Sequence, residues 1–305
     1  MRFLDRLWVV DSVDAVATAT WHGPAAASRL RDQYLSALSD LQSWTTLQWK
    51  PDGIAITFDN PGATKDFIQR AAWDRDRPAD DRLFPSHLRP RLYDLISNGL
   101  DSIAASSRDL RELIELTIGE IFLAQEDGSE GGTMSSAVGL IWLNPRKEWD
   151  PRKTGENIVH EWIHNMLFLA DMVNPLFAVD YVGLSADSAH ATSAILHRKR
   201  PFDRCYHSAA VAAGLVFYHS ISGDQQKADA LIEPTMTTVR ELQDKPELMT
   251  PSGADLLQGV ASFLETRDCD RIVALLSGTR VASGCVAPIS SQASATGRTA
   301  SPSRP

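Results

Sequence analysis

The chain has 305 residues, enough for one large domain or two small ones, and its 43% hydrophobic and 23% charged content is ordinary for a globular protein. Its formal net charge of −9 argues against nucleic-acid binding through a general basic surface, although Arg198-Lys199-Arg200 is a local basic patch. No run reaches the roughly 18 apolar residues of a membrane span, and Asp11 and Asp14 interrupt the signal-like start. Three cysteines without CxxC spacing argue against a disulfide framework, so we expect a cytoplasmic location.

The first part of the chain, residues 1–110, is predicted to be mostly helical. Apolar residues recur at helical spacing over about 25–41 and from Pro90 to about Ser106, whereas 53–58 alternates like a short strand. The polar segment 73–81 is predicted to be a loop.

The next part, residues 111–280, is predicted to hold a small sheet followed by helices. The strand candidates are 113–123 and 138–143, which are separated by an exposed loop at 126–132. A strand shortly before a metal-binding helix is the order found in zincin-like enzymes, where an edge strand can hold an extended peptide by main-chain pairing. Helices are predicted over about 186–197, 203–221, 225–243 and 252–276, and the Ser/Ala/Pro-rich tail 281–305 is predicted to be disordered.

The most informative motif is His160-Glu161-Trp162-Ile163-His164, an HExxH sequence. On a helix, side chains at i and i+4 lie on one face, so both imidazoles can reach one divalent metal while Glu161 projects toward a metal-bound water. The flanking residues favour a helix, because Thr154 can cap it and apolar residues recur around the motif. The motif therefore predicts a metal site.

A tight site needs a third protein ligand, and the sequence leaves several candidates. The segment after His164 lacks the Gly and His of the metzincin motif, which excludes that class. His207 ranks first because small residues surround it on a predicted helix that can approach the HExxH helix closely, and Glu233 ranks second as the ligand of a thermolysin-like site. Other candidates, for which surface, capping or supporting roles are favoured over ligation, are Asp171, Asp187, His190, His197 and His219.

Three segments together resemble the HExxH-type peptide-modification proteins of bacterial gene clusters for ribosomally made peptides. They are the Ser-containing segment and apolar strand at 132–145, the motif helix at 159–169, and Arg200-Pro201 followed by Tyr206-His207. The resemblance covers about residues 130–220. The chain departs from the family at two places. Residues 195–200 lack the aromatic Pro-Trp-Arg type segment, and Ala210 or Val211 stands where the family has an aromatic residue. These departures are those expected of a distant member.

The resemblance implies an Fe(II)- and 2-oxoglutarate-dependent peptide β-hydroxylase. His160, His164 and His207 would be the metal ligands, leaving room for 2-oxoglutarate and O₂ on the ion. The distal carboxylate of 2-oxoglutarate needs a cation, for which Arg200 and Arg204 are the candidates. Glu161 is the candidate catalytic residue, and its role differs between the chemistries, since in a zinc peptidase it would be the base acting on metal-bound water.

We therefore expect a mostly helical α+β fold, in which a zincin-like metal helix lies beside a small sheet. The expected function is metal-dependent modification of a peptide or protein substrate, without nucleic-acid or membrane partners. A zinc metallopeptidase of the zincin type is the main alternative. A third alternative is a metal-free binding protein in which the histidines of the motif are buried for packing.

Overall fold

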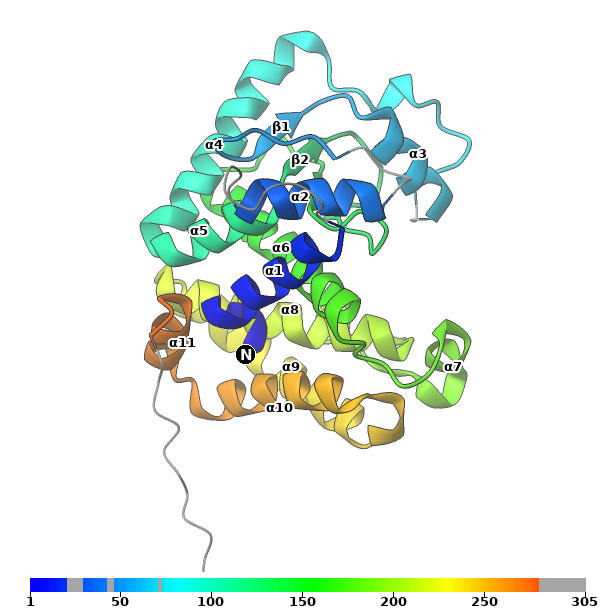
Figure 1. Cartoon of the computed structure of the whole chain (residues 1–305), viewed down its shortest axis with the longest axis vertical. Coiled ribbons are helices and arrows are strands. Elements are labelled where there is room, and N and C mark those ends of the chain that lie inside the picture. The colour runs from blue at the N-terminus through cyan, green and yellow to red at the C-terminus, as the bar shows by residue number, and fades with distance from the viewer. Residues whose placement is uncertain (21–29, 43–46, 71–72, 280–305) are drawn as a thin grey trace, which may run out of the picture.

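The computed structural model describes residues 1–20, 30–42, 47–70 and 73–279. Helices surround a small mixed sheet, which confirms the expected mostly helical α+β class (Figure 1). The predicted tail 281–305 and the first five residues of the helix predicted at 25–41 lie outside the described residues.

The sheet has the strand order β1-β2-β4-β3. Its three parallel strands are β1 (Ala55–Thr57), β2 (Glu120–Leu123) and β4 (Leu140–Leu143), and every residue of β2 and β4 is buried, as parallel strands covered on both faces require. The short strand β3 (Gly131–Gly132) runs antiparallel to β4 at the edge of the sheet.

The HExxH motif lies on the long helix α6 (Pro151–Val173), which packs against β4. Pro151 occupies the first helical position, so the cap falls one residue earlier, on Asp150, whose carboxylate accepts a hydrogen bond from the amide of Lys153. The prediction that Thr154 caps this helix is therefore wrong. Its side chain is buried in the first turn, and its hydroxyl donates to the Asp150 carbonyl.

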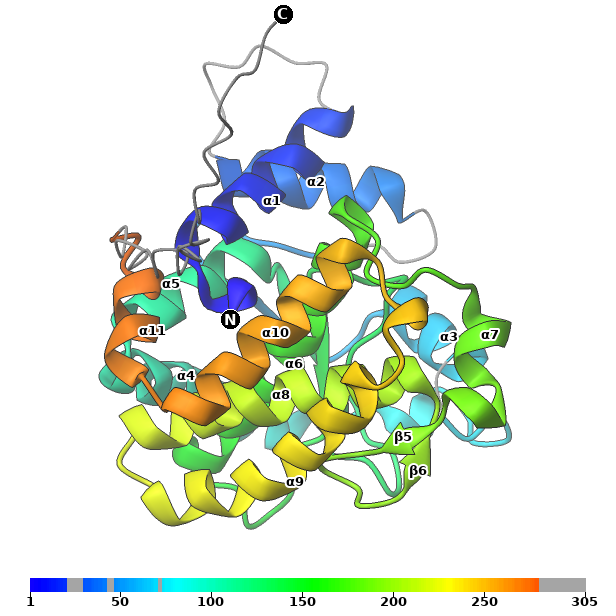
Figure 2. The ribbon, with the colours of Figure 1, turned by 90° about the horizontal axis from the view of Figure 1, so that it is seen from below.

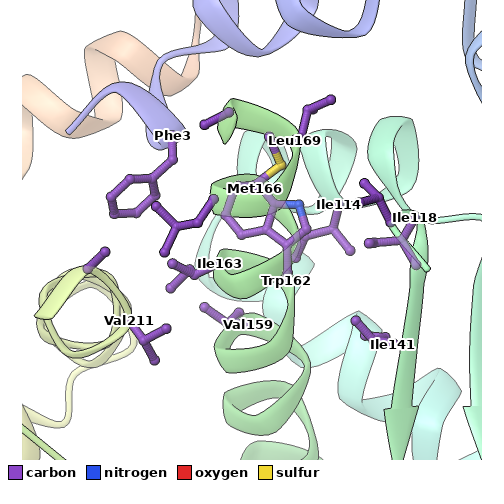
Figure 3. Close-up of a cluster of buried hydrophobic side chains, with 14 of the residues drawn as sticks. Phe3, Ile114, Ile118, Ile141, Val159, Trp162, Ile163, Met166, Leu169 and Val211 are labelled. Carbon is purple, nitrogen blue, oxygen red and sulfur yellow. The ribbon is translucent and has the colours of Figure 1, made fainter. Parts of the chain in front are cut away.

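Two helices flank α6 at very close range, namely α4 (Arg89–Ser106) and α8 (Phe202–Ile221). A Cβ added at Gly99 of α4 would lie 2.6 Å from Thr154 Cγ2, and one added at Gly214 of α8 would lie 2.3 Å from Ile163 Cδ1. Such distances are shorter than van der Waals contact, so glycine is what lets the backbones come together. Figure 3 shows the resulting core, in which Trp162 and Ile163 of α6 point into side chains from several other elements.

The remaining helices complete one hydrophobic core, which includes residues from Met1 to Leu276 and joins the first 110 residues to the rest of the chain. The boundary expected at residue 110 lies within α5. Strand β1, which precedes this boundary, pairs with strand β2, which follows it. The other described α-helices are α1 (Arg6–Thr20), α2 (Leu30–Leu41), α3 (Pro61–Arg70), α5 (Arg108–Thr117), α7 (Tyr181–Ser185), α9 (Gln225–Gln243), α10 (Pro251–Thr266) and α11 (Cys269–Leu276). In the described part of the chain, no helix combines the length and the apolar character that crossing a bilayer requires.

The strand predicted at 113–123 is half wrong, because residues 108–117 form helix α5 and only 120–123 form a strand. Ser107 caps α5 by accepting a hydrogen bond from the amide of Leu110. The apolar residues buried on α5 are Leu110, Leu113 and Ile114, a spacing of three and four residues that fits one helical face.

The helix predicted at 186–197 is also wrong. After a 3-10 turn at Asp187–Ala189, the chain forms the hairpin β5 (Ala191–Thr192) and β6 (Lys199–Arg200) (Figure 2). A tertiary contact overrides the local propensity, since the amide and hydroxyl of Thr192 both donate to the carboxylate of Glu241 on α9. The single helix predicted at 252–276 is divided in two by Arg267, whose positive φ of 52° ends α10.

A buried ion pair fixes the loop that leads into the edge strand β3. Arg82 and Glu126 are both buried and their side chains are hydrogen-bonded to each other. Asn144, directly after β4, donates to the backbone carbonyls of Glu126 and Ser129. The loop 126–132 is therefore held at both ends, and β3 has a defined place beside α6.

The close contact between α4 and α6 can be tested with Gly99→Ala. Alanine is the better helix former, yet the added methyl group would overlap Thr154, so we expect the free energy of unfolding to fall by about 1–3 kcal/mol. Gly259→Ala on α10 is the matched control, because its methyl group would meet only ordinary contacts; it should raise stability by up to about 1 kcal/mol. Urea denaturation followed by circular dichroism measures both, and equal stabilisation by the two variants would contradict the packing.

Candidate metal centre

The structure brings three histidines together, two from α6 and one from α8. The rings of His160 and His164 lie one helical turn apart, with centroids separated by 5.2 Å. The ring of His207 lies edge to edge with that of His164, with centroids 5.3 Å apart and an interplanar angle of 20°. The two Nδ1 atoms of this pair are 3.0 Å apart. Residues 43 positions apart in sequence thus share one site.

His207 reaches α6 because α8 is lined with small residues where the two helices pack. The stretch that follows it is buried and consists largely of small residues, namely Ser208, Ala209, Ala210, Ala212, Ala213 and Gly214. The helices run antiparallel, since His164 meets His207 near one end and Gly155 lies against Tyr218 near the other. Phe168, one turn after His164, covers His207 with a ring-centroid distance of 4.8 Å.

The Nδ1 atoms of His164 and His207 face each other directly, because the 3.0 Å between them and the 5.3 Å between the ring centroids place both nitrogens on the line that joins the rings. With a proton on one nitrogen, the pair forms a hydrogen bond. An ion about 2.1 Å from both nitrogens would lie off this line, so both rings would have to turn to bind it. Among the described residues, no group of three or more His, Cys, Asp or Glu side chains is already arranged around one point as metal ligands. The three imidazoles are suitable donors for a divalent ion, and their rings would have to turn to share one.

Burial keeps these imidazoles uncharged. Desolvation lowers the pKa of His207 to about 3, and the positive charge of Arg204 adds to the effect. Desolvation also lowers the pKa of His164 well below its ordinary value, with further contributions from His160, His207, Arg204 and Arg200. The pKa of His160 is lowered by the same cause. Neutral imidazole is the form that binds metal, so the environment favours the ligand state at neutral pH.

Glu161 points away from the His164–His207 pair toward the edge strand. Its carboxylate accepts a hydrogen bond of 2.8 Å from the hydroxyl of Thr133, directly after β3, and its Oε1 lies 3.9 Å from Nε2 of His160. Burial raises the pKa of Glu161 to about 7, and the hydrogen bond from Thr133 partly opposes this. The carboxyl group is therefore poised to hold or release a proton near neutral pH, and it joins the metal helix to the edge of the sheet.

Arg200 and Arg204 lie on the α8 side of the histidines. Arg200 is the last residue of β6, and Arg204 is in the first turn of α8, one turn before His207. Both charges contribute to lowering the pKa of His164. The structure thus brings together four residues that the sequence singled out, namely His160, Glu161, His164 and His207, and Arg204 and Arg200 precede His207 on the segment that leads to it.

The other candidate ligands lie outside this cluster. Glu233, ranked second, is 78% exposed on α9 and its carboxylate contacts Arg240 at 3.6 Å. Asp171 accepts a hydrogen bond from the amide of Leu176 and so stabilises the turn after α6. His219 pairs with Glu156 at 3.8 Å near the start of α6. The remaining candidates lie in the irregular segment and hairpin turn between α7 and α8, namely Asp187, His190 and His197.

Sequence reasoning missed three residues that support the site. Thr133 orients Glu161, and Phe168 covers His207. Asn165, next to His164, receives a hydrogen bond from the amide of Gly139 and donates to the carbonyl of Leu140, which fixes α6 under β4. Asn165 could have been suspected, because it is the one polar residue besides His164 in the apolar stretch 162–170. Nothing in the sequence pairs Thr133 with Glu161.

Comparison with known proteins finds no matching family model and no matching curated protein. The resemblance to HExxH-type peptide-modification proteins rests on the residues of this chain alone.

The neutral state of His207 predicts how stability depends on pH. Because its pKa is about 3 in the folded chain and about 6.5 in an unfolded one, unfolding takes up a proton between these values. The contribution of His207 therefore leaves the free energy of unfolding highest above about pH 6.5 and lowers it as the pH falls toward 3. His207→Gln should reduce the slope of unfolding free energy against pH near pH 5 by about 1.4 kcal/mol per unit.

Urea denaturation of metal-free protein at a series of pH values measures this slope. His87→Gln is the matched control, because His87 is an exposed histidine, and its slope should stay near that of the wild type. An unchanged slope in His207→Gln would show that His207 is protonated in the folded chain.

Proposed function

We propose that this chain is a metal-dependent enzyme that modifies a peptide, with His160, His164 and His207 as the metal ligands. The observation that carries the proposal is the 3.0 Å approach of His207 to the HExxH helix, which adds a third neutral imidazole to the two of the motif. The favoured chemistry is Fe(II)- and 2-oxoglutarate-dependent β-hydroxylation of a ribosomally made peptide. The proposed setting is the cytoplasm.

The donor set supports this chemistry over a structural metal site. Three protein ligands leave coordination positions open, which a closed structural site does not. Bound iron with 2-oxoglutarate would supply the oxidant: one atom of O₂ enters the substrate C–H bond, and the other oxidises the cosubstrate to succinate and CO₂. Arg200 and Arg204, on the segment that leads to His207, would supply the cations, and a guanidinium fork suits the distal carboxylate of 2-oxoglutarate.

The other side chains would control protons and water. Glu161, fixed by Thr133, holds a proton near neutral pH at its carboxyl group and so donates or accepts a hydrogen bond beside His160. The apolar ring of Phe168 packs against the ring of His207 and would limit the access of water to the Nδ1 atoms of His164 and His207. Exclusion of water strengthens the interaction of the arginines with an anionic ligand.

A zinc metallopeptidase of the zincin type is the second candidate, and one observation favours it. Glu161 lies beside the edge strand β3, where a peptide could pair with the main chain while the carboxylate acts as base on a metal-bound water. The proposal ranks it second because Glu233, the ligand expected for a thermolysin-like site, is exposed on α9.

Removal of the ligands tests the metal site. His160→Ala and His164→Ala should each abolish binding of one divalent ion, and His207→Ala should lower the affinity strongly with the fold intact. Glu233→Ala is the control and should bind metal as the wild type does. Elemental analysis of anaerobically purified protein, with circular dichroism for the fold, measures this. Stoichiometric metal in the double variant of His160 and His164 would overturn this site, whereas absence of metal from the wild type would support the metal-free binding protein.

The metal and cosubstrate dependence separates the two enzyme classes. The Fe(II) form should convert 2-oxoglutarate to succinate and add one oxygen atom to a peptide without cutting it, whereas the Zn(II) form should be inert because zinc has no accessible redox change. Mass spectrometry of the peptide and succinate quantification provide the readout. Cleavage by the zinc form, independent of 2-oxoglutarate and lost in Glu161→Gln, would establish the peptidase.

A further inference from the structure

Three arginines follow one another on the β5–β6 hairpin and in the first turn of α8, namely Arg198, Arg200 and Arg204. Arg198 extends the hairpin ladder, since its carbonyl accepts a hydrogen bond from the amide of Ser193. Alternate residues of a strand face opposite sides, and Lys199 faces α9, where it contacts Glu241 at 2.8 Å. Arg198 and Arg200 therefore face away from Lys199 and α9.

The positive charge of this face is largely uncompensated. Among the described residues, neither Arg198 nor Arg200 has a carboxylate partner, and Arg204 contacts only Asp203, at 3.6 Å. Burial lowers the pKa of Arg200, and the charges of Arg204 and Arg198 lower it further, whereas Asp203 opposes them. Like charges held together cost free energy, and they stand on a chain whose net charge is −9.

The hairpin is too firmly attached for these charges to spread apart by moving it. The hydroxyl of Ser208, next to His207, accepts a hydrogen bond from the amide of Ile195 and contacts the hydroxyl of Ser193. On the other side, Lys245 donates to the carbonyl of His190 and Glu241 accepts from Thr192. The cationic face is thus preorganised, which is the condition under which a charged patch binds an anion at least entropic cost.

The arginines differ in how near they lie to His207 along the chain. Arg204 is one helical turn before His207, Arg200 ends β6 just before α8, and Arg198 is exposed in the hairpin. The cosubstrate of the proposed function would take Arg200 and Arg204. Arg198, exposed and without a carboxylate partner among the described residues, is then available to an anionic group of a larger ligand.

We propose that the substrate is an acidic peptide, one of whose Asp or Glu side chains binds Arg198 on the β5–β6 hairpin. The inference rests on the proposed function where it calls the peptide a substrate and where it assigns Arg200 and Arg204 to the cosubstrate, whereas binding of an acidic peptide to Arg198 does not depend on it. A carboxylate on a peptide is favoured over a nucleic-acid phosphate because the basic face is one short segment, and the overall negative charge would repel a polyanion.

The test is direct binding, measured by fluorescence anisotropy on metal-free, full-length protein. The probes are a short fluorescein-labelled peptide in which glutamate alternates with serine, glycine and leucine, and its matched version with glutamine in place of glutamate. The glutamate peptide should bind at least about tenfold more tightly, and added salt should weaken it. Arg198→Gln should reduce the affinity, and Arg198→Glu should reduce it by about tenfold or more.

Arg108→Glu is the matched control, because Arg108 is an 89% exposed arginine on α5, and it should leave binding unchanged. Equal binding of the two peptides, equal losses in Arg198→Glu and Arg108→Glu, or tighter binding of a labelled single-stranded oligonucleotide would each overturn the proposal. The binding test uses metal-free protein and so does not depend on enzymatic activity. If the protein binds the acidic peptide but has neither hydroxylase nor peptidase activity, only the proposed function is overturned. Activity on a neutral peptide without acidic selectivity would overturn this inference alone.

Discussion

The antiparallel contact between α6 and α8 is the constraint on which the site depends. The small side chains after His207 let the two helices pack closely enough for its Nδ1 to lie 3.0 Å from that of His164. Larger side chains at Ala210 or Gly214 would push α8 outward and remove the third imidazole. The same contact buries Ile163 of α6 against Gly214 and Val211 of α8, so site geometry and stability have a common cause (Figure 3).

Burial then sets the charges of the groups that the packing assembles. Three imidazoles in a desolvated place stay neutral, and a carboxyl group there has a raised pKa. The arginines reinforce this, because a proton on His164 or His207 would add a positive charge beside Arg204. A site of neutral nitrogen donors beside fixed cations suits a divalent ion with anionic ligands better than it suits an unassisted acid or base.

The predictions from sequence succeeded where a pattern was long and local. The helix of the HExxH motif, the helix of His207 and the buried strand at 138–143 follow from apolar periodicity and length. They failed where a contact distant in sequence decided the structure, as in the hairpin at 191–200, which Glu241 and Ser208 hold in place. They also failed at 113–117, where a short apolar run fits a helix as well as a strand.

The sequence by itself determined that His160 and His164 share one face of a helix, because a spacing of four residues is nearly one turn whatever surrounds it. It also indicated that the helix of His207 was able to come close, since its side chains are small. Only the tertiary structure decided that His207 rather than Glu233 meets the pair, that Thr133 holds Glu161, and that residues 191–200 form a hairpin. These are contacts between separate elements, and they depend on crossing geometry and register, which no local pattern encodes.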